Sequence, residues 1–125
     1  MNINENTLRI WAKEAGFSEC ALCGAEPFEN ERLLTENQPP LKERSQLRFD
    51  PEMDLECVNS LAVLLWAYRP AKLPADGCIF VDSYYDASNA AYHAARTIEK
   101  RLLDAGCYAK ANVSYPAKSA AVRAA

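Results

Sequence analysis

Two cysteines separated by two residues are the clearest candidate for chemistry in this sequence. Cys20 and Cys23 form a CxxC pair, the spacing with which many zinc and iron–sulfur sites begin. A tetrahedral site needs a second pair of ligands, and the chain has no other CxxC and no HxxxH. The pair also falls in a predicted strand, where residues three apart point to opposite faces. We therefore expect two small buried side chains here and predict no metal site.

Asp82 and His93 are the candidates for proton transfer. His93 is the only histidine, on or beside the charged face of a predicted long helix. A lone histidine in such a place can be a proton carrier, but it is more often a surface or packing residue. Asp82 is flanked by Ser83, Tyr84 and Tyr85 near a predicted strand end. It either lines a pocket there, as a candidate catalytic residue, or faces water.

Motifs that bind phosphate or activate a serine are missing from the sequence. It contains no GxGxxG, no P-loop and no GxSxG, and it has four glycines in all. Fourteen basic and seventeen acidic residues give a net charge of −3, which argues against a dedicated nucleic-acid-binding protein. A module that touches RNA as part of something larger remains possible.

Length and composition predict one globular domain. The chain has 125 residues, of which 50% are hydrophobic and 25% are charged. Its five cysteines are an odd number, which favours reduced thiols over a disulfide framework. No apolar run reaches the length of a membrane span, and the N-terminus does not resemble a signal peptide. We expect a cytoplasmic protein without membrane contact.

Apolar spacing and capping residues predict the helices. The first is capped by Asn6 or Thr7 and ends at Gly16, and a short second helix has Pro27 in its first turn. The clearest runs over Ser88–Ala105 and closes at Gly106. A last helix opens at Pro116, and its final residues, 123–125, are expected to fray or to lean on a neighbouring molecule.

The remaining apolar stretches predict strands. They cover residues 17–25, 60–68, 78–85 and 107–114, and the second of these is apolar enough for a central strand. Residues 38–54 are polar and contain three prolines, as expected of a surface connection. The expected fold class is α/β (α+β), a single domain with a mixed sheet of about four strands packed against helices.

Four segments, taken in order, carry a resemblance to a known family. They are AKEAGFSECALCGAEP (residues 12–27), RFDPEMDLECVNSLAVLLWAYRP (48–70), YYDASNAAYHAARTIEKRLLDAG (84–106) and YPAKSAAVRAA (115–125). Together they are similar to the N-terminal domain of epoxyqueuosine reductase and of related 4Fe-4S iron–sulfur proteins. In that family the last segment continues into a cysteine-rich iron–sulfur domain. The resemblance thus implies that this chain is the N-terminal α/β domain, a truncated fragment of a longer protein.

The resemblance also implies a cofactor and a reaction. Family members hold cobalamin between the two domains and reduce an epoxide in a modified tRNA nucleoside, with electrons from two 4Fe-4S clusters. It places Tyr84, Tyr85, His93 and Ser114 at the cobalamin and makes Tyr115 a further catalytic candidate. The family aspartate that is taken to donate a proton is replaced by Val113. A paralogue with another acceptor is therefore expected.

Two functions remain open from the sequence. The chain is either the cobalamin-cradling module of an epoxyqueuosine reductase-like oxidoreductase or a non-catalytic scaffold domain that kept the fold and lost the cofactor. On the first reading its partners are its own C-terminal iron–sulfur domain and a tRNA or small-molecule acceptor. On either reading we expect no cofactor in this fragment, with at most a weak affinity for cobalamin, and no activity of the fragment alone.

Overall fold

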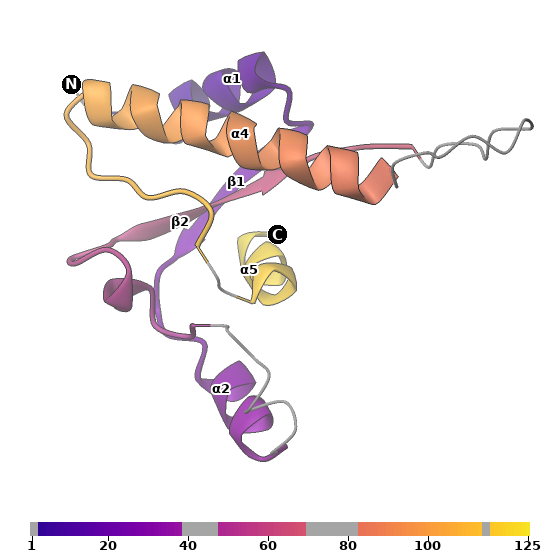
Figure 1. The fold of residues 1–125 in the computed structure, drawn as a ribbon. Coiled ribbons are helices and arrows are strands. Elements are labelled where there is room, and N and C mark those ends of the chain that lie inside the picture. The colour runs from indigo at the N-terminus through magenta and orange to yellow at the C-terminus, as the bar shows by residue number, and fades with distance from the viewer. Residues whose placement is uncertain (1–2, 39–47, 70–82, 114–115) are drawn as a thin grey trace, which may run out of the picture. The chain divides into compact units, whose positions relative to one another are not determined.

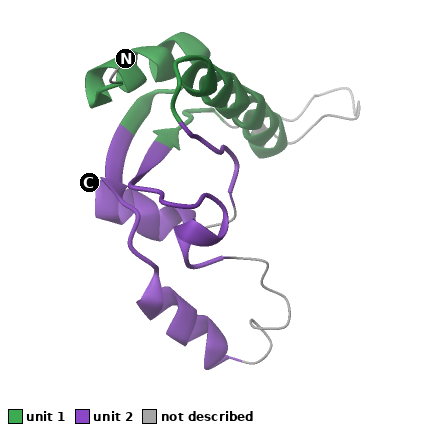
Figure 2. Cartoon of the chain, turned by 90° about the vertical axis from the view of Figure 1, so that its left-hand side faces the viewer, with its two compact units in different colours: residues 1–20, 64–107 green, residues 21–63, 108–125 purple. Residues whose placement is uncertain are grey.

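The chain has a mixed α/β fold. The computed structural model describes residues 3–38, 48–69, 83–113 and 116–125. Its elements, in order, are α1 (Glu5–Ala15), β1 (Glu19–Gly24), α2 (Glu29–Glu36), the 3-10 turn η1 (Pro51–Met53), β2 (Ser60–Leu65), α4 (Ser83–Asp104) and α5 (Ala117–Ala124) (Figure 1). They fall into two compact units, residues 1–20 with 64–107 and residues 21–63 with 108–125 (Figure 2).

Helix α1 begins and ends at well-defined caps. The Asn4 side chain accepts a hydrogen bond of 2.9 Å from the backbone N–H of Thr7, so the cap lies earlier than the predicted Asn6 or Thr7. Gly16 ends the helix in the left-handed conformation, with φ of 108°. A Cβ at this glycine would lie 2.8 Å from the Trp66 ring, so the close approach also favours glycine. The predicted end of the helix is confirmed.

Helix α4 packs against α1 within the first unit, as both ribbon views show (Figures 1 and 2). It buries Ala87 and Ile98, whereas His93, Arg96, Lys100 and Asp104 are exposed, as the sequence predicted. The Arg101 guanidinium lies 4.3 Å from the centre of the Trp11 ring and pairs with Glu14 at 2.6 Å. Among the described helices, none is both long and apolar enough to cross a bilayer.

The sheet is smaller than predicted. Among the described residues it consists of β1 and β2, paired antiparallel. The backbone N–H of Ser18, just before β1, donates to the carbonyl of Leu65 at 2.8 Å. The strands predicted within residues 17–25 and 60–68 are confirmed as β1 and β2, but β2 is not the central strand that was expected. Leu65 is 49% exposed, and β2 pairs with β1 alone in the part of the chain that is described.

Two predicted strands are not found where the chain is described. Tyr84 and Tyr85 belong to the first turns of α4, which therefore begins five residues earlier than Ser88. Their aromatic character suggested a strand, but the alanine-rich sequence that follows favours a helix that takes them in. Residues 107–113 are not a strand either, and Asn112 has φ of 59°, which breaks an extended run. Residues 78–82 and 114 lie outside the described part.

Helix α5 is held in the second unit by Arg123. One guanidinium nitrogen, Nη1, donates to the carbonyls of Gly24 at 3.0 Å and Glu26 at 2.7 Å. The guanidinium also lies 4.0 Å from the centre of the buried Phe28 ring. Residues 123–125 were expected to fray or to lean on a neighbouring molecule, and this stays a prediction, whereas the side chain of Arg123 is held within the second unit. Pro116 is the N-cap of α5 rather than its first helical residue.

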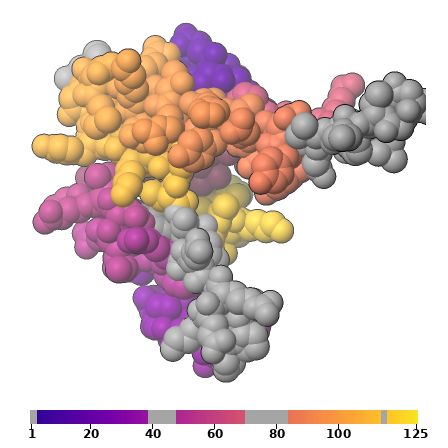
Figure 3. All heavy atoms as spheres, viewed as in Figure 1, coloured from indigo at the N-terminus to yellow at the C-terminus, as the bar shows by residue number. Residues whose placement is uncertain are grey.

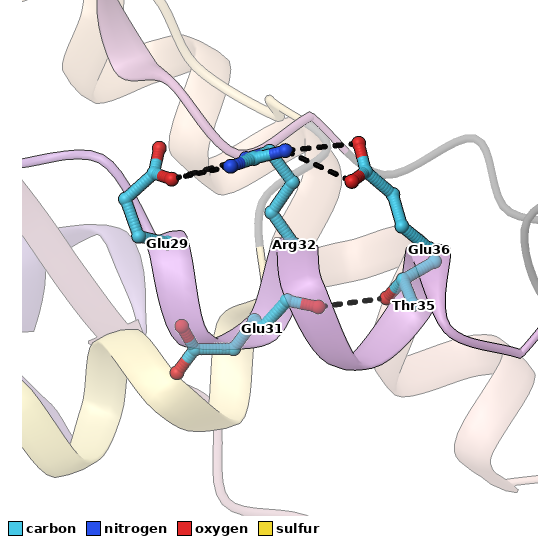
Figure 4. A network of polar contacts seen from close by, with 5 residues as sticks. All are labelled: Glu29, Glu31, Arg32, Thr35 and Glu36. Carbon is cyan, nitrogen blue, oxygen red and sulfur yellow. Dashed lines mark hydrogen bonds and ion pairs between the residues drawn. The ribbon is translucent and has the colours of Figure 1, made fainter.

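Helix α2 has no buried residue and is stabilised on its surface. Figure 4 shows Arg32 between Glu29 and Glu36, with nitrogen–oxygen distances of 2.7 and 2.9 Å. Thr35 donates its hydroxyl to the carbonyl of Glu31 at 2.9 Å. Such exposed pairs contribute a few tenths of a kcal/mol each. The helix begins at Glu29, so the predicted Pro27 precedes its first turn.

Residues 48–54 belong to the predicted surface connection but are not wholly exposed. Pro51 is fully buried at the start of η1, and Asp50 caps this turn by accepting from the N–H of Glu52 at 3.1 Å. The side chain of Asp54 is 10% exposed. Its carboxylate pairs with Arg48 at 3.5 Å and with Lys110 at 3.8 Å. The described end of this connection is therefore an anchored part of the second unit.

Replacing Arg123 by alanine should destabilise the protein. Arg123→Ala removes both hydrogen bonds and leaves two carbonyls without this donor, so we expect a loss of about 2 kcal/mol in the free energy of unfolding. Lys118→Ala, on an exposed position of the same helix, is the matched control and should change it by less than about 0.5 kcal/mol. Urea denaturation measures both, and equal losses would contradict the anchoring role of Arg123.

A second substitution tests the packing of α4. Ile98 is 4% exposed, so Ile98→Ala should lower the free energy of unfolding by about 2–5 kcal/mol because it leaves a cavity. Leu103, on the same helix and 48% exposed, provides the control. A Leu103→Ala variant as unstable as Ile98→Ala in urea would mean that α4 buries a different face.

Candidate functional site

The first half of α4 carries a shallow hollow lined by tyrosines. The hollow has a volume of about 340 Å³ and is lined by Tyr84, Tyr85, Ser88, Asn89 and Tyr92. These residues follow one another at spacings of one, three, one and three along a helix, so they share one face. That face is turned to the outside, because α4 buries Ala87 and Ile98 instead. Figure 3 shows α4, in coral and orange, on the surface of the molecule.

The aromatic side chains of this hollow are well exposed. Tyr85 is 73% exposed and Tyr84 is 62% exposed, although tyrosines usually bury much of their rings. Tyr68, after β2, meets Tyr84 edge to face with ring centres 6.3 Å apart, which extends the aromatic surface. None of the five lining side chains is charged. The hollow thus offers ring faces, hydroxyls and one amide to a flat, uncharged group.

His93 lies beside the hollow and does not line it. Its ring meets that of Tyr92 edge to face, with ring centres 5.6 Å apart. The side chain is exposed, and the backbone carbonyl accepts a hydrogen bond of 3.2 Å from the Thr97 hydroxyl. This position matches the expectation of a surface residue. The predicted contact of His93 with a cofactor remains a prediction.

The other predicted site residues are only partly described. Tyr84 and Tyr85 both line the hollow, and their contact with a cofactor stays a prediction. Asp82, Ser114 and Tyr115 lie outside the described residues, and their roles stay predictions. Sequence reasoning did not include Ser88 or Tyr68. The spacing of four residues from Tyr84 to Ser88 and on to Tyr92 could have indicated the first of these.

Cys20 and Cys23 both lie in β1. Cys20 is buried and Cys23 is half-buried, and burial raises the pKa of both thiols above the usual range. The nearby Arg9 opposes this rise for Cys20, but with a smaller effect. A protonated thiol is a poor nucleophile and a poor metal ligand. Within the described residues, no group of three or more His, Cys, Asp and Glu side chains could hold a metal ion.

Comparison with known proteins identifies no relative from which the role of these residues could be inferred. No protein-family model matches the chain, and neither a curated protein nor a solved structure is significantly similar to it. The resemblance to epoxyqueuosine reductase described above therefore remains a prediction from the sequence.

Thiol labelling tests the environment of β1. Cys57 is exposed, whereas Cys20 is only 3% exposed. The pKa of the Cys20 thiol is raised, so near neutral pH a smaller fraction of Cys20 is thiolate than of an ordinary cysteine. We expect iodoacetamide at pH 7.5 to modify Cys57 well before Cys20, and the delay should shorten as the pH rises towards 9. Peptide mass spectrometry measures each rate. Labelling in urea, where the thiols should react alike, is the control, and equal rates in the native protein would contradict this assignment.

Proposed function

We propose that this chain is a cofactor-binding module, similar to the N-terminal domain of epoxyqueuosine reductase, and that the aromatic hollow on α4 contacts one edge of a cobalamin. The observation that carries the proposal is the joint exposure of Tyr84 and Tyr85 in one hollow. These are two of the positions that the sequence resemblance assigns to the cofactor. Exposed aromatic faces are unfavourable in water and gain stability when a ring system covers them.

The lining residues suit part of such a cofactor. A corrin ring has a broad apolar face and carries amide groups around its edge, which match the tyrosine rings, the Ser88 hydroxyl and the Asn89 amide. The hollow is open and, at about 340 Å³, is smaller than a corrin. The chain alone can therefore cover only one edge. The remaining contacts would come from the iron–sulfur domain that the resemblance implies as a partner.

The role of the chain's own residues would be binding and orientation. When bound, cobalamin supplies a reducible cobalt centre. Tyr84 and Tyr85 would exclude water from one side of the ring, and Asn89 would fix its rotation through hydrogen bonds to edge amides. No acid stands at position 113, where Val113 replaces the family aspartate, so this position cannot donate a proton to an acceptor. This favours an acceptor other than epoxyqueuosine.

The same replacement favours a second candidate function. A chain that kept the aromatic surface but lost the cofactor would act as a non-catalytic binding or scaffold domain. Its exposed tyrosines would then contact a protein, since tyrosine is enriched at protein interfaces. The two functions differ in one measurable property, which is the affinity of the chain for cobalamin.

A binding titration tests the proposal. The 125-residue chain is titrated with hydroxocobalamin and followed by equilibrium dialysis and by visible absorption. We expect weak, saturable binding, because only part of the cradle is present. Tyr85→Ala should weaken it about fivefold by removing a stacked ring, and Asn89→Ala should weaken it as well.

Tyr108→Ala is the matched control for this titration. Tyr108 is 90% exposed and does not line the hollow, so its loss should leave the affinity unchanged. Absence of saturable binding to the unsubstituted chain would reject the cofactor module and leave the scaffold function. Binding that Tyr85→Ala and Tyr108→Ala weaken equally would reject the assigned hollow.

A further inference from the structure

A second hollow lies on the other helix of the first unit. It has a volume of about 570 Å³ and is lined by Asn6, Arg9, Ile10 and Lys13 of α1 and by Glu19 and Cys20 of β1. The four α1 residues follow one another at spacings of three, one and three, which places them on a single helix face. That face is distinct from the one that buries Leu8 and Ala12. The hollow therefore uses the outer face of α1 and the start of β1.

Arg9 is fixed in this hollow from two sides. Its Nε donates to the carbonyl of Cys20 at 3.2 Å, and its Nη2 donates to the carboxylate of Glu5 at 2.8 Å. No hydrogen bond from Nη1 to another described residue is found. A guanidinium held in this way loses little further freedom when its remaining donor binds a ligand. Arg9 is thus a pre-organised donor for an acidic group.

Lys13 and Glu19 bring opposite charges to the same hollow. Neither forms an ion pair with a charged group in the described parts of the chain. Lys13 lies four residues after Arg9 and adds a second positive charge on the same side of α1. Glu19 stands on β1 and would repel a simple anion. A ligand that pairs with Arg9, Lys13 and Glu19 together would carry a carboxylate for the two basic groups, of which Arg9 also keeps its ion pair with Glu5, and an ammonium for Glu19.

We propose that this hollow binds a small aliphatic zwitterion, either a free amino acid or a short peptide, with its carboxylate on Arg9 and Lys13 and its ammonium on Glu19. Ile10 supplies the apolar contact, since its side chain lines the hollow and is 57% exposed. The volume is in the range of small-molecule sites and has room for a leucine-sized ligand. This site is independent of the aromatic hollow on α4.

Three related probes test the charge requirement. Leucine carries both charges, N-acetyl-leucine lacks the ammonium and leucinamide lacks the carboxylate, and Leu-Leu represents the peptide source. Calorimetric titration of the full chain should show leucine or Leu-Leu binding at least about tenfold more tightly than both blocked probes. Each blocked probe lacks one of the two charged groups and so loses the charge-assisted hydrogen bond that this group would form. The tighter of the two zwitterions identifies the source.

Two substitutions assign the charges to residues. Lys13→Ala and Glu19→Gln should each weaken the binding of the zwitterion about tenfold. Glu19→Gln should, however, leave the weak binding of N-acetyl-leucine unchanged or improve it. Lys100→Ala, at an exposed position on α4, is the control that removes an equal charge elsewhere. Three outcomes would each overturn the proposal. They are binding of N-acetyl-leucine as tight as that of leucine, equal effects of Lys13→Ala and Lys100→Ala, and no binding of either zwitterion. None of these outcomes bears on cobalamin binding, which is measured separately.

Discussion

The packing of α1 against α4 is the contact on which both hollows depend. Each helix turns its small or apolar residues to the inside, Leu8 and Ala12 from α1 and Ala87 and Ile98 from α4. Arg101 joins the two through the Trp11 ring and Glu14. Because one face of each helix is committed to this packing, the opposite faces are left to solvent. The tyrosines of α4 and the charged residues of α1 lie on those outer faces, so the rigidity of both sites comes from the same helix pair.

Each unit also uses an arginine to cover an aromatic ring. Arg101 lies over Trp11 in the first unit, and Arg123 lies over Phe28 in the second. Both guanidiniums are held by oxygen acceptors, a carboxylate for Arg101 and two carbonyls for Arg123. A guanidinium can do this because it is flat and weakly hydrated, so it stacks on a ring while its edge forms hydrogen bonds. Lysine offers no flat face and could not replace either residue on equal terms.

The sequence predicted the helices better than the sheet. Regular apolar spacing, Gly16 and Gly106 mark α1 and α4, because a helix and its end are determined by residues close together in the chain. Strand pairing depends on distant residues, and for this reason residues 107–113 and both Tyr84 and Tyr85 were assigned wrongly to strands. The aromatic positions were proposed from a family resemblance, and their contact with a cofactor stays a prediction. The charged hollow was not found, since Arg9 and Lys13 look like ordinary surface charges until Cys20 and Glu19 are brought beside them by the turn at Gly16.

The distribution of charge separates the two hollows chemically. The α4 hollow has no charged side chain in its lining, so a charged ligand would lose hydration there without gaining an ion pair. The α1 hollow contains Arg9, Lys13 and Glu19, so a large apolar ring placed there would take water from all three without satisfying them. Each site therefore disfavours the ligand proposed for the other. It follows that the two ligands should not compete, and that charge substitutions on α1 should leave ring binding on α4 unaffected.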